Sequence, residues 1–245
     1  LKLRVEGDFV KATGTTLGAD NGIAVAYALS ILDSDDISHP PLEVLITTDE
    51  ESGMTGAVGL NPKDISGRIL LNMDSGEEGT LLTSCAGGMR SLIKIPIKKE
   101  SLDSEFIGYN IKVRGLKGGH SGDDINKERG NSNKVMGRIL NEVSSHIDIK
   151  LVSISGGAKA NAIPRESDSI VLINQNDIGK LEECINDLQK KIKNELKSSD
   201  SDIMIQLEKT DTNYNECYSS ETTQKVIEIL VLLPNGVQTM SSDIK

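Results

Sequence analysis

The chain has 245 residues, which suits one large domain or two modest ones, and 37 acidic against 27 basic residues give a formal charge of −10. This acidic excess argues against sequence-independent binding of nucleic acid, which needs a basic surface. The longest apolar stretch, residues 229–233, is far too short to cross a bilayer, and no secretory signal is visible. We therefore expect a cytoplasmic protein that binds neither nucleic acid nor membrane.

The first part of the chain has the pattern of an α/β domain. Residues 1–19 read as an extended segment with a glycine-bearing turn, and apolar residues on both sides of a helical wheel predict a buried helix at 21–34. The apolar runs 42–47 and 69–73 predict buried strands of the parallel type. Residues 53–60 predict a turn with a short helix, and 81–97 one or two further strands.

A charged stretch at 98–105 is a candidate domain boundary, and a different rhythm follows it. Strands are predicted at 109–115, 150–155, 168–173 and 203–207, with helices at 131–146 and 178–196. This β-α-β-β-α-β order is that of the ferredoxin-like sandwich, in which two helices cover one face of a four-stranded antiparallel sheet. A last helix is predicted at about 221–233.

Acidic residues lie where predicted strands or tight turns end. Asp20 follows a Leu-Gly-Ala turn, Glu50 and Glu51 close the run that begins at 42, and Asp74 closes the next one. Sites in open α/β sheets are built at the carboxyl ends of strands. Acids gathered there repel one another unless a cation neutralises them. The pattern therefore predicts a metal site made by Asp20, Glu51 and Asp74, with one acid left for proton transfer.

Each of these acids also has a plainer interpretation. Asp20 could be only a turn former and helix N-cap, the Glu50-Glu51 pair a solvated loop, and Asp74 a polar strand exit. Their joint occurrence favours the metal site. Two metal ions about 3.5–4 Å apart can share a carboxylate and a water that becomes a nucleophile. A nearby base must then take its proton, so adjacent Glu50 and Glu51 can divide the two tasks.

The second informative motif is Gly118-Gly-His-Ser-Gly122, in a loop after the first predicted strand of the second domain. Glycines on both sides of a histidine allow close approach of the backbone and expose the ring, although a flexible turn would look the same. The motif lacks the Lys and Ser/Thr spacing of a P-loop. His39 and His146 are predicted to lie in a loop and at a helix end, so only His120 has a context that suggests chemistry.

Together these motifs resemble aminoacyl-histidine dipeptidase, a dinuclear zinc exopeptidase family related to carnosinases and cytosolic tripeptidases. The resemblance runs nearly end to end. The matching segments are Gly14-Thr-Thr-Leu-Gly-Ala-Asp-Asn-Gly22, Pro41-Leu-Glu-Val-Leu, Glu50-Glu51 with Gly53-Met54, Asn72-Met-Asp-Ser75, Cys85-Ala-Gly-Gly88, Gly115-Leu-Lys-Gly-Gly-His-Ser-Gly122, Asn161-Ala-Ile-Pro-Arg-Glu166 and Pro234-Asn-Gly-Val237.

The resemblance implies a role for each acid of the first domain. Asp20 would bridge two metal ions, and the Asp20–Asn21 peptide is often cis in this family. Glu51 and Asp74 would each bind one ion, while Glu50 would be the general base. The cofactor implied is a pair of divalent ions, zinc in the first place, with cobalt or manganese as alternatives.

In the second domain, His120 would stabilise the tetrahedral oxyanion, and Asn161 and Arg165 match a lid segment that contacts substrate. Lid domains of such enzymes often mediate dimerisation, so the resemblance implies a homodimer. The fold class expected is therefore α/β: a partial metallopeptidase domain over residues 1–105 and a ferredoxin-like α+β lid or dimerisation domain over 106–245.

The chain also departs from the family pattern. The first metal-binding histidine, in a His-x-Asp motif, is expected upstream of the 19 residues that precede Asp20, and the last one beyond Lys245. We therefore expect a piece that lacks both ends and carries three of the five protein ligands. By itself it should bind metal weakly, with a preference for ions harder than zinc, and should hydrolyse nothing.

Three functions fit these observations. The first is metal-dependent hydrolysis of short peptides, such as Xaa-His dipeptides, by a metal-bridging hydroxide with Glu50 as base. The second is a related amidohydrolase or deacetylase that uses the same site on an N-acyl substrate. The third is a non-catalytic dimerisation piece. The Cys-Ala-Gly-Gly and Asn-Ala-Ile-Pro-Arg-Glu segments favour the dipeptidase.

Overall fold

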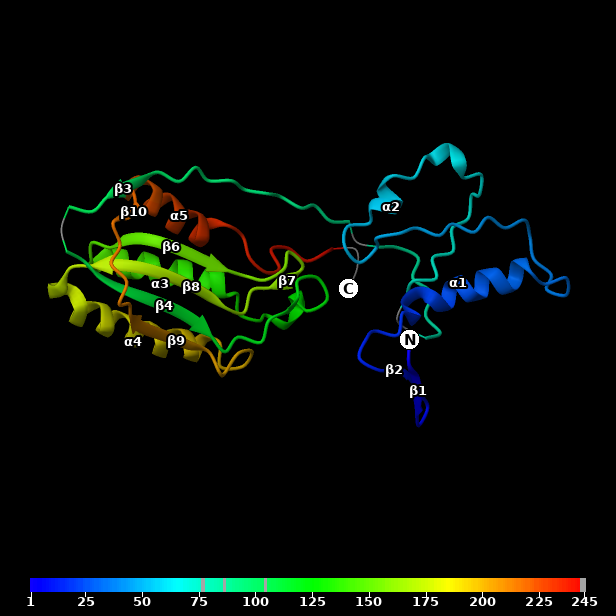
Figure 1. Ribbon diagram of the computed structural model, residues 1–245, viewed down its shortest axis with the longest axis horizontal. Coiled ribbons are helices and arrows are strands. Elements are labelled where there is room, and N and C mark those ends of the chain that lie inside the picture. Colours follow the sequence, from blue (N-terminus) through cyan, green and yellow to red (C-terminus); the bar gives the residue numbers. More distant parts are fainter. Residues whose placement is uncertain (76–77, 86, 104, 243–245) are drawn as a thin grey trace. The chain divides into compact units, whose positions relative to one another are not determined.

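The structure, a computed structural model, describes residues 1–75, 78–85, 87–103 and 105–242. It divides into two compact units, Leu1–Met89 and Arg90–Lys245 (Figure 1). This division lies before the charged stretch expected as a boundary, of which Ser104 is outside the described residues. The cause is a short strand, β3 (Lys99–Ser101), that pairs antiparallel with β10 (Glu216–Tyr218) and so joins the charged stretch to the second unit.

The first unit begins with a hairpin of β1 (Leu3–Glu6) and β2 (Phe9–Ala12), whose turn contains Gly7 at φ 60°. Helix α1 (Ala19–Leu32) confirms the predicted first helix. Helix α2 (Thr55–Val58) confirms the short one, and the 3-10 turn η1 (Pro62–Asp64) follows it.

The predicted strands of the first unit are wrong. The described residues of 42–47, 69–73 and 81–97 form no strand; Ala86, inside the last range, lies outside the described residues. Strands need hydrogen-bonding neighbours, and within the described part of Leu1–Met89 only β1 and β2 pair. The predicted burial is wrong for the same region: no described residue of this unit is buried, and Leu70 is 84% exposed. Apolar runs that read as core strands here lack the layers that would cover them.

The second unit has the predicted ferredoxin-like order. Its sheet strands are β4 (Ile107–Arg114), β6 (Lys150–Gly156), β8 (Ser167–Ile173) and β9 (Met204–Lys209). Its helices are α3 (Ser132–His146), α4 (Ile178–Glu195) and α5 (Ser220–Leu232). Shorter elements are β5 (Gly119–His120), β7 (Ala162–Ile163), η2 (Ile125–Lys127) and η3 (Gln175–Asp177).

The four sheet strands run antiparallel in the order β6-β8-β4-β9, and α3 and α4 pack side by side against the sheet (Figure 1). Alternate residues of β4, such as Ile111 and Val113, are fully buried, as half-buried strands require. They meet the apolar stripes of the two helices, which include Ile139 and Leu181. The predicted α+β architecture of this unit is confirmed.

Helix α5 packs on α3, and a lysine of α3 caps the C-terminal end of α5. A Cβ at Gly137 would lie 2.7 Å from the Cβ of Leu230, so a glycine on α3 lets α5 come close. Lys134 Nζ donates to the carbonyl oxygens of Val231 at 2.6 Å and Leu233 at 2.7 Å. A cation at these unpaired carbonyls is favourable at a helix C-terminus. Among the described residues, no helix is long and apolar enough to cross a membrane.

Candidate functional site

Asp20 lies in an irregular first turn of α1. The Asp20–Asn21 peptide is cis, as the resemblance implies, and both residues have non-helical φ and ψ angles. Asn21 Oδ1 accepts the backbone N–H of Ala24 at 3.1 Å, so Asn21 rather than Asp20 caps the regular part of the helix. The plainer interpretation of Asp20 as an N-cap is therefore not what the structure shows, and Asp20 itself is exposed.

The turn of Asp20 is tied to the segment of Asp74. Asn21 Nδ2 donates to the carbonyl oxygen of Met73 at 2.9 Å. Asp74 is in turn held by its own backbone N–H, which donates to Asn72 Oδ1 at 2.9 Å. Asn21 and Met73, 52 positions apart in the chain, are thus in contact, and they are adjacent in sequence to Asp20 and Asp74, two of the three expected metal ligands.

Glu50 and Glu51 occupy an exposed turn that a third acid organises. Asp49 has φ 64°, and its carbonyl oxygen accepts the N–H groups of Gly53 and Met54. Its carboxylate accepts the hydroxyl of Thr55 at 2.6 Å, a hydrogen bond that lowers the pKa of Asp49. Asp49 is therefore the structural acid of this cluster. Glu50 and Glu51 are left on the outside of the turn.

The described residues contain no group of three or more His, Cys, Asp or Glu side chains placed to hold a metal ion. The expected gathering of Asp20, Glu51 and Asp74 is therefore not seen, and their assignment as ligands stays a prediction. Their chemistry suits a divalent cation, because all three supply carboxylate oxygens. The Asn21–Met73 hydrogen bond also brings two of the three segments together.

The other candidate residues belong to the second unit. His120 is on β5, which pairs antiparallel with β7 so that His120 is opposite Ala162. Ser121 N–H donates to the carbonyl oxygen of Asn161 at 2.9 Å. A Cβ at Gly118 would lie 3.3 Å from the Cβ of Arg165. The structure thus places His120 on β5 beside β7, and Asn161 and Arg165 flank β7 in the chain, about forty residues after His120.

The ring of His120 is held by backbone amides. Its Nδ1 accepts the N–H of Gly122 at 3.2 Å and the N–H of Asp123 at 3.1 Å. A neutral imidazole that accepts at Nδ1 carries its proton on Nε2. The side chain is 50% exposed, so this Nε2–H is an available hydrogen-bond donor. When the ring is protonated, Asp123 Oδ2 at 3.5 Å from Nδ1 is an ion-pair partner.

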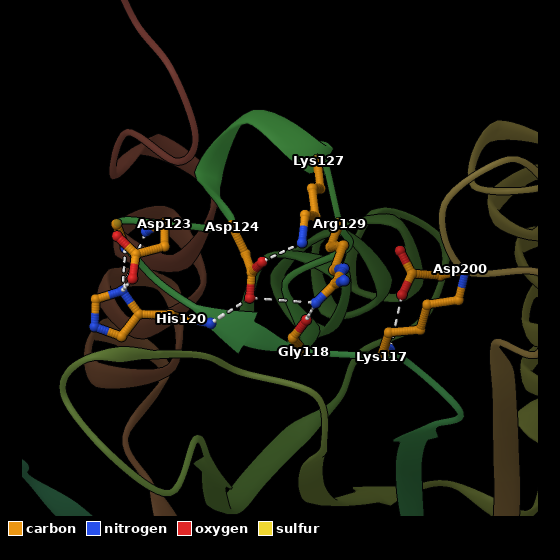
Figure 2. Close-up of polar contacts among 9 residues, drawn as sticks. Lys117, Gly118, His120, Asp123, Asp124, Lys127, Arg129 and Asp200 are labelled. Atoms are coloured by element: carbon orange, nitrogen blue, oxygen red, sulfur yellow. Dashed lines mark hydrogen bonds and ion pairs between the residues drawn. The ribbon is translucent and has the colours of Figure 1, made fainter. Parts of the chain in front are cut away.

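Asp124 organises the turn that carries His120 (Figure 2). Its Oδ2 accepts the His120 N–H at 2.8 Å, and its own N–H donates to the His120 carbonyl oxygen at 3.1 Å. Lys127 Nζ donates to Oδ1 at 2.5 Å, and Arg129 Nη1 lies 3.5 Å from Oδ2. The Lys127 hydrogen bond, followed by the His120 N–H, lowers the pKa of Asp124.

A second carboxylate closes the base of the same loop. Asp200 is fully buried, and its oxygens accept the N–H of Lys117 and the N–H of Gly130, each at 2.8 Å. Lys117 and Gly130 lie at the two ends of the segment that contains His120, and Figure 2 shows the contact of Lys117 with Asp200. A Cβ at Gly130 would lie 2.7 Å from Cδ2 of Leu116, so the Leu116 side chain would have to shift to admit a larger residue there.

Sequence reasoning missed Asp124 and Asp200. Both act on backbone N–H groups, which carry no residue-specific signal. Asp124, four residues after His120, could have been found from the short Asp-containing turn, since Asp side chains often accept nearby amides. Asp200, 70 residues from Gly130, had no such local signal.

Comparison with known proteins agrees with the motifs. Residues 105–200 match the peptidase dimerisation domain family. The chain is 37% identical over 233 residues, 95% of its length, to the cytosol non-specific dipeptidase of Escherichia coli. Its structure matches that of the aminoacylhistidine dipeptidase of Vibrio alginolyticus with a TM-score of 0.78 and 37% identity over 100% of the chain.

The chain spans 48% of the length of the E. coli protein and 50% of the Vibrio chain. Within that half, the similarity covers both the acidic segments and the His120 domain. The resemblance to the aminoacyl-histidine dipeptidases is confirmed.

Proposed function

Because the resemblance covers nearly the whole chain, we propose that the protein carrying this sequence is a metal-dependent dipeptidase of the cytoplasm that hydrolyses short peptides, with Xaa-His dipeptides as the leading substrates. The observation that carries the proposal is the 37% identity over 95% of the chain to one dipeptidase, with a structural match to another. The motifs for the acids and for His120 lie inside the matched region.

The acids of the first unit are proposed to hold two divalent ions, with zinc as the leading choice. Asp20 would be the ligand that both ions share, and Glu51 and Asp74 would each hold one. Bound divalent ions lower the pKa of a coordinated water toward neutrality and polarise the substrate carbonyl. Glu50, beside a ligand in the exposed turn, receives the proton of the attacking water and passes it to the leaving amine.

In the second unit, His120 is proposed to donate its Nε2–H to the carbonyl oxygen as charge develops there. A preorganised donor of this kind typically contributes about 10²–10³ in kcat. Support comes from the two backbone amides at Nδ1, which leave the proton on the exposed nitrogen. Asn161 and Arg165, which flank the neighbouring strand β7, are proposed to contact the substrate. The second unit is proposed to join two subunits in a homodimer.

The test is hydrolysis of a panel of dipeptides and N-acyl amino acids by the full-length protein and by its Glu50→Ala variant. We expect dipeptide hydrolysis that falls by at least about 10²-fold in the variant, because a missing general base typically costs that much. Asp64→Asn, at an exposed acid of η1, is the control and should keep full activity. Undiminished hydrolysis in Glu50→Ala contradicts the mechanism, and turnover of N-acyl substrates alone selects the amidohydrolase.

A further inference from the structure

We propose that Asp124 is a positioning residue for His120: its carboxylate holds the turn of residues 120–124 so that Nδ1 receives two backbone amides and Nε2–H points outward. The use of that proton on a substrate rests on the function proposed above. The arrangement of the turn rests only on the contacts of this unit.

The bonds between Asp124 and His120 are reciprocal. The carboxylate accepts the His120 N–H at 2.8 Å, and the Asp124 N–H donates back to the His120 carbonyl oxygen at 3.1 Å. The chain between them is closed into a compact turn, and the amides of Gly122 and Asp123 lie inside it. Both amides point at Nδ1. The ring therefore depends on the turn, and the turn depends on the carboxylate.

Two cations keep the Asp124 carboxylate in place. Lys127 contacts Oδ1 from one side, and Arg129 approaches Oδ2 from the other. Arg129 Nη1 also donates to the carbonyl oxygen of Gly118, so it links the carboxylate to the residue just before β5. Charge-assisted hydrogen bonds of this kind are stronger than neutral ones. With one side chain 21% and the other 23% exposed, the Asp124–Arg129 pair is also partly shielded from water.

The base of the loop is fixed independently by Asp200, which accepts amides at both of its ends. Removal of Asp124 should therefore loosen the tip of the loop without releasing its base. None of residues 117–130 belongs to the buried apolar cluster, so loss of the Asp124 carboxylate should leave the packing of the domain core unchanged.

The experiment is NMR on the ¹⁵N-labelled chain, in which the ring nitrogens of only three histidines must be assigned. At about pH 8.5 an ordinary imidazole is neutral, so the ring shifts report its tautomer. In the unsubstituted chain His120 should show a hydrogen-bonded Nδ1 and a protonated Nε2. In Asp124→Ala the ring should average between tautomers as in a free side chain. The amides of Gly122 and Asp123 should exchange about 10- to 100-fold faster, as loss of charge-assisted hydrogen bonds predicts.

Asp123→Ala is the matched control. It removes the neighbouring carboxylate, whose side chain is 91% exposed, but keeps the backbone amide that reaches Nδ1. Its His120 ring shifts should stay those of the unsubstituted chain. Asp124→Asn, which keeps an acceptor but loses the charge, should give an intermediate result.

Unchanged His120 shifts and amide exchange in Asp124→Ala would overturn the proposal. So would faster exchange of the β4 amides of Ile111 and Val113, because Asp124 would then support the domain rather than the turn. Failure of the proposed function has a different signature: His120→Ala in the full-length protein would leave dipeptide hydrolysis intact while the NMR result stood.

Discussion

At the scale of the residue, Gly119 decides whether the His120 turn has room to form. Its φ is +141°, a backbone angle that residues other than glycine rarely adopt. A Cβ there would overlap Asp124 Oδ2 and lie 2.5 Å from Arg129 Nη1. The carboxylate and the guanidinium therefore occupy the space that any other residue would need.

We expect Gly119→Ala to lower the free energy of unfolding by about 1–3 kcal/mol, the usual range for a residue held in a disfavoured conformation. Urea unfolding of the chain measures it. Gly179→Ala is the matched control, because a Cβ on Gly179 at the start of α4 meets nothing within 4 Å, and it should be neutral or slightly stabilising. Equal midpoints for the two variants would show that the space at Gly119 is not needed.

Residue by residue, the sequence allowed prediction of what has a local signature. The glycines around His120 indicated a close backbone approach, and the structure has one. The resemblance implied a cis Asp20–Asn21 peptide, and it is present. The structural roles of Asp49 and Asp124 were not predicted. Each accepts hydrogen bonds within a turn, and residue identity alone does not reveal the geometry of that turn.

At the scale of the element, the second unit was predictable because its pattern repeats over many residues. The helix 178–196 and the alternation of 109–115 each require one particular face to be buried, and the sheet and two helices satisfy those requirements together. The runs 42–47 and 69–73 are short and uniformly apolar. Such runs indicate burial without saying what covers them, so the strand prediction failed where covering layers are absent from the described residues.

The two sheet-covering helices are linked by one paired charge. Arg138 on α3 donates two hydrogen bonds to Glu195 on α4, at 2.7 and 2.9 Å. The Arg138 hydrogen bond lowers the pKa of Glu195. A carboxyl whose pKa is lower in the folded state stabilises the fold above its unfolded pKa, about 4.3 for glutamate, and loses that contribution as pH falls through the folded value.

Glu195→Gln should therefore destabilise the chain at neutral pH by less than about 1 kcal/mol, since the pair is nearly half exposed. The difference from the unsubstituted chain should shrink as the pH falls through the folded-state pKa of Glu195, because below that value Glu195 is protonated in both states. Urea unfolding at several pH values checks this, with the exposed Glu183→Gln on the same helix as control. A difference that persists at low pH would rule out the charge as its origin.

At the scale of the whole molecule, the two units differ in how much apolar surface they bury. The buried apolar cluster lies wholly in Arg90–Lys245, where His120 is presented on a well-supported loop. The described part of Leu1–Met89 exposes its apolar runs and carries the expected metal ligands on exposed segments. Whether these carboxylates lie together depends on long-range packing, which a sequence pattern at single strand ends cannot specify.

The most direct test of the account is the metal content of the full-length protein and its acid variants, measured by elemental analysis after removal of free ions. We predict two divalent ions per chain, and we expect Asp20→Asn to lose both because its carboxylate is the ligand proposed to be shared by the two ions. Glu51→Gln and Asp74→Asn should each weaken one ion, while His120→Ala keeps both. Two ions retained by Asp20→Asn would contradict the central claim that these acids form one metal site.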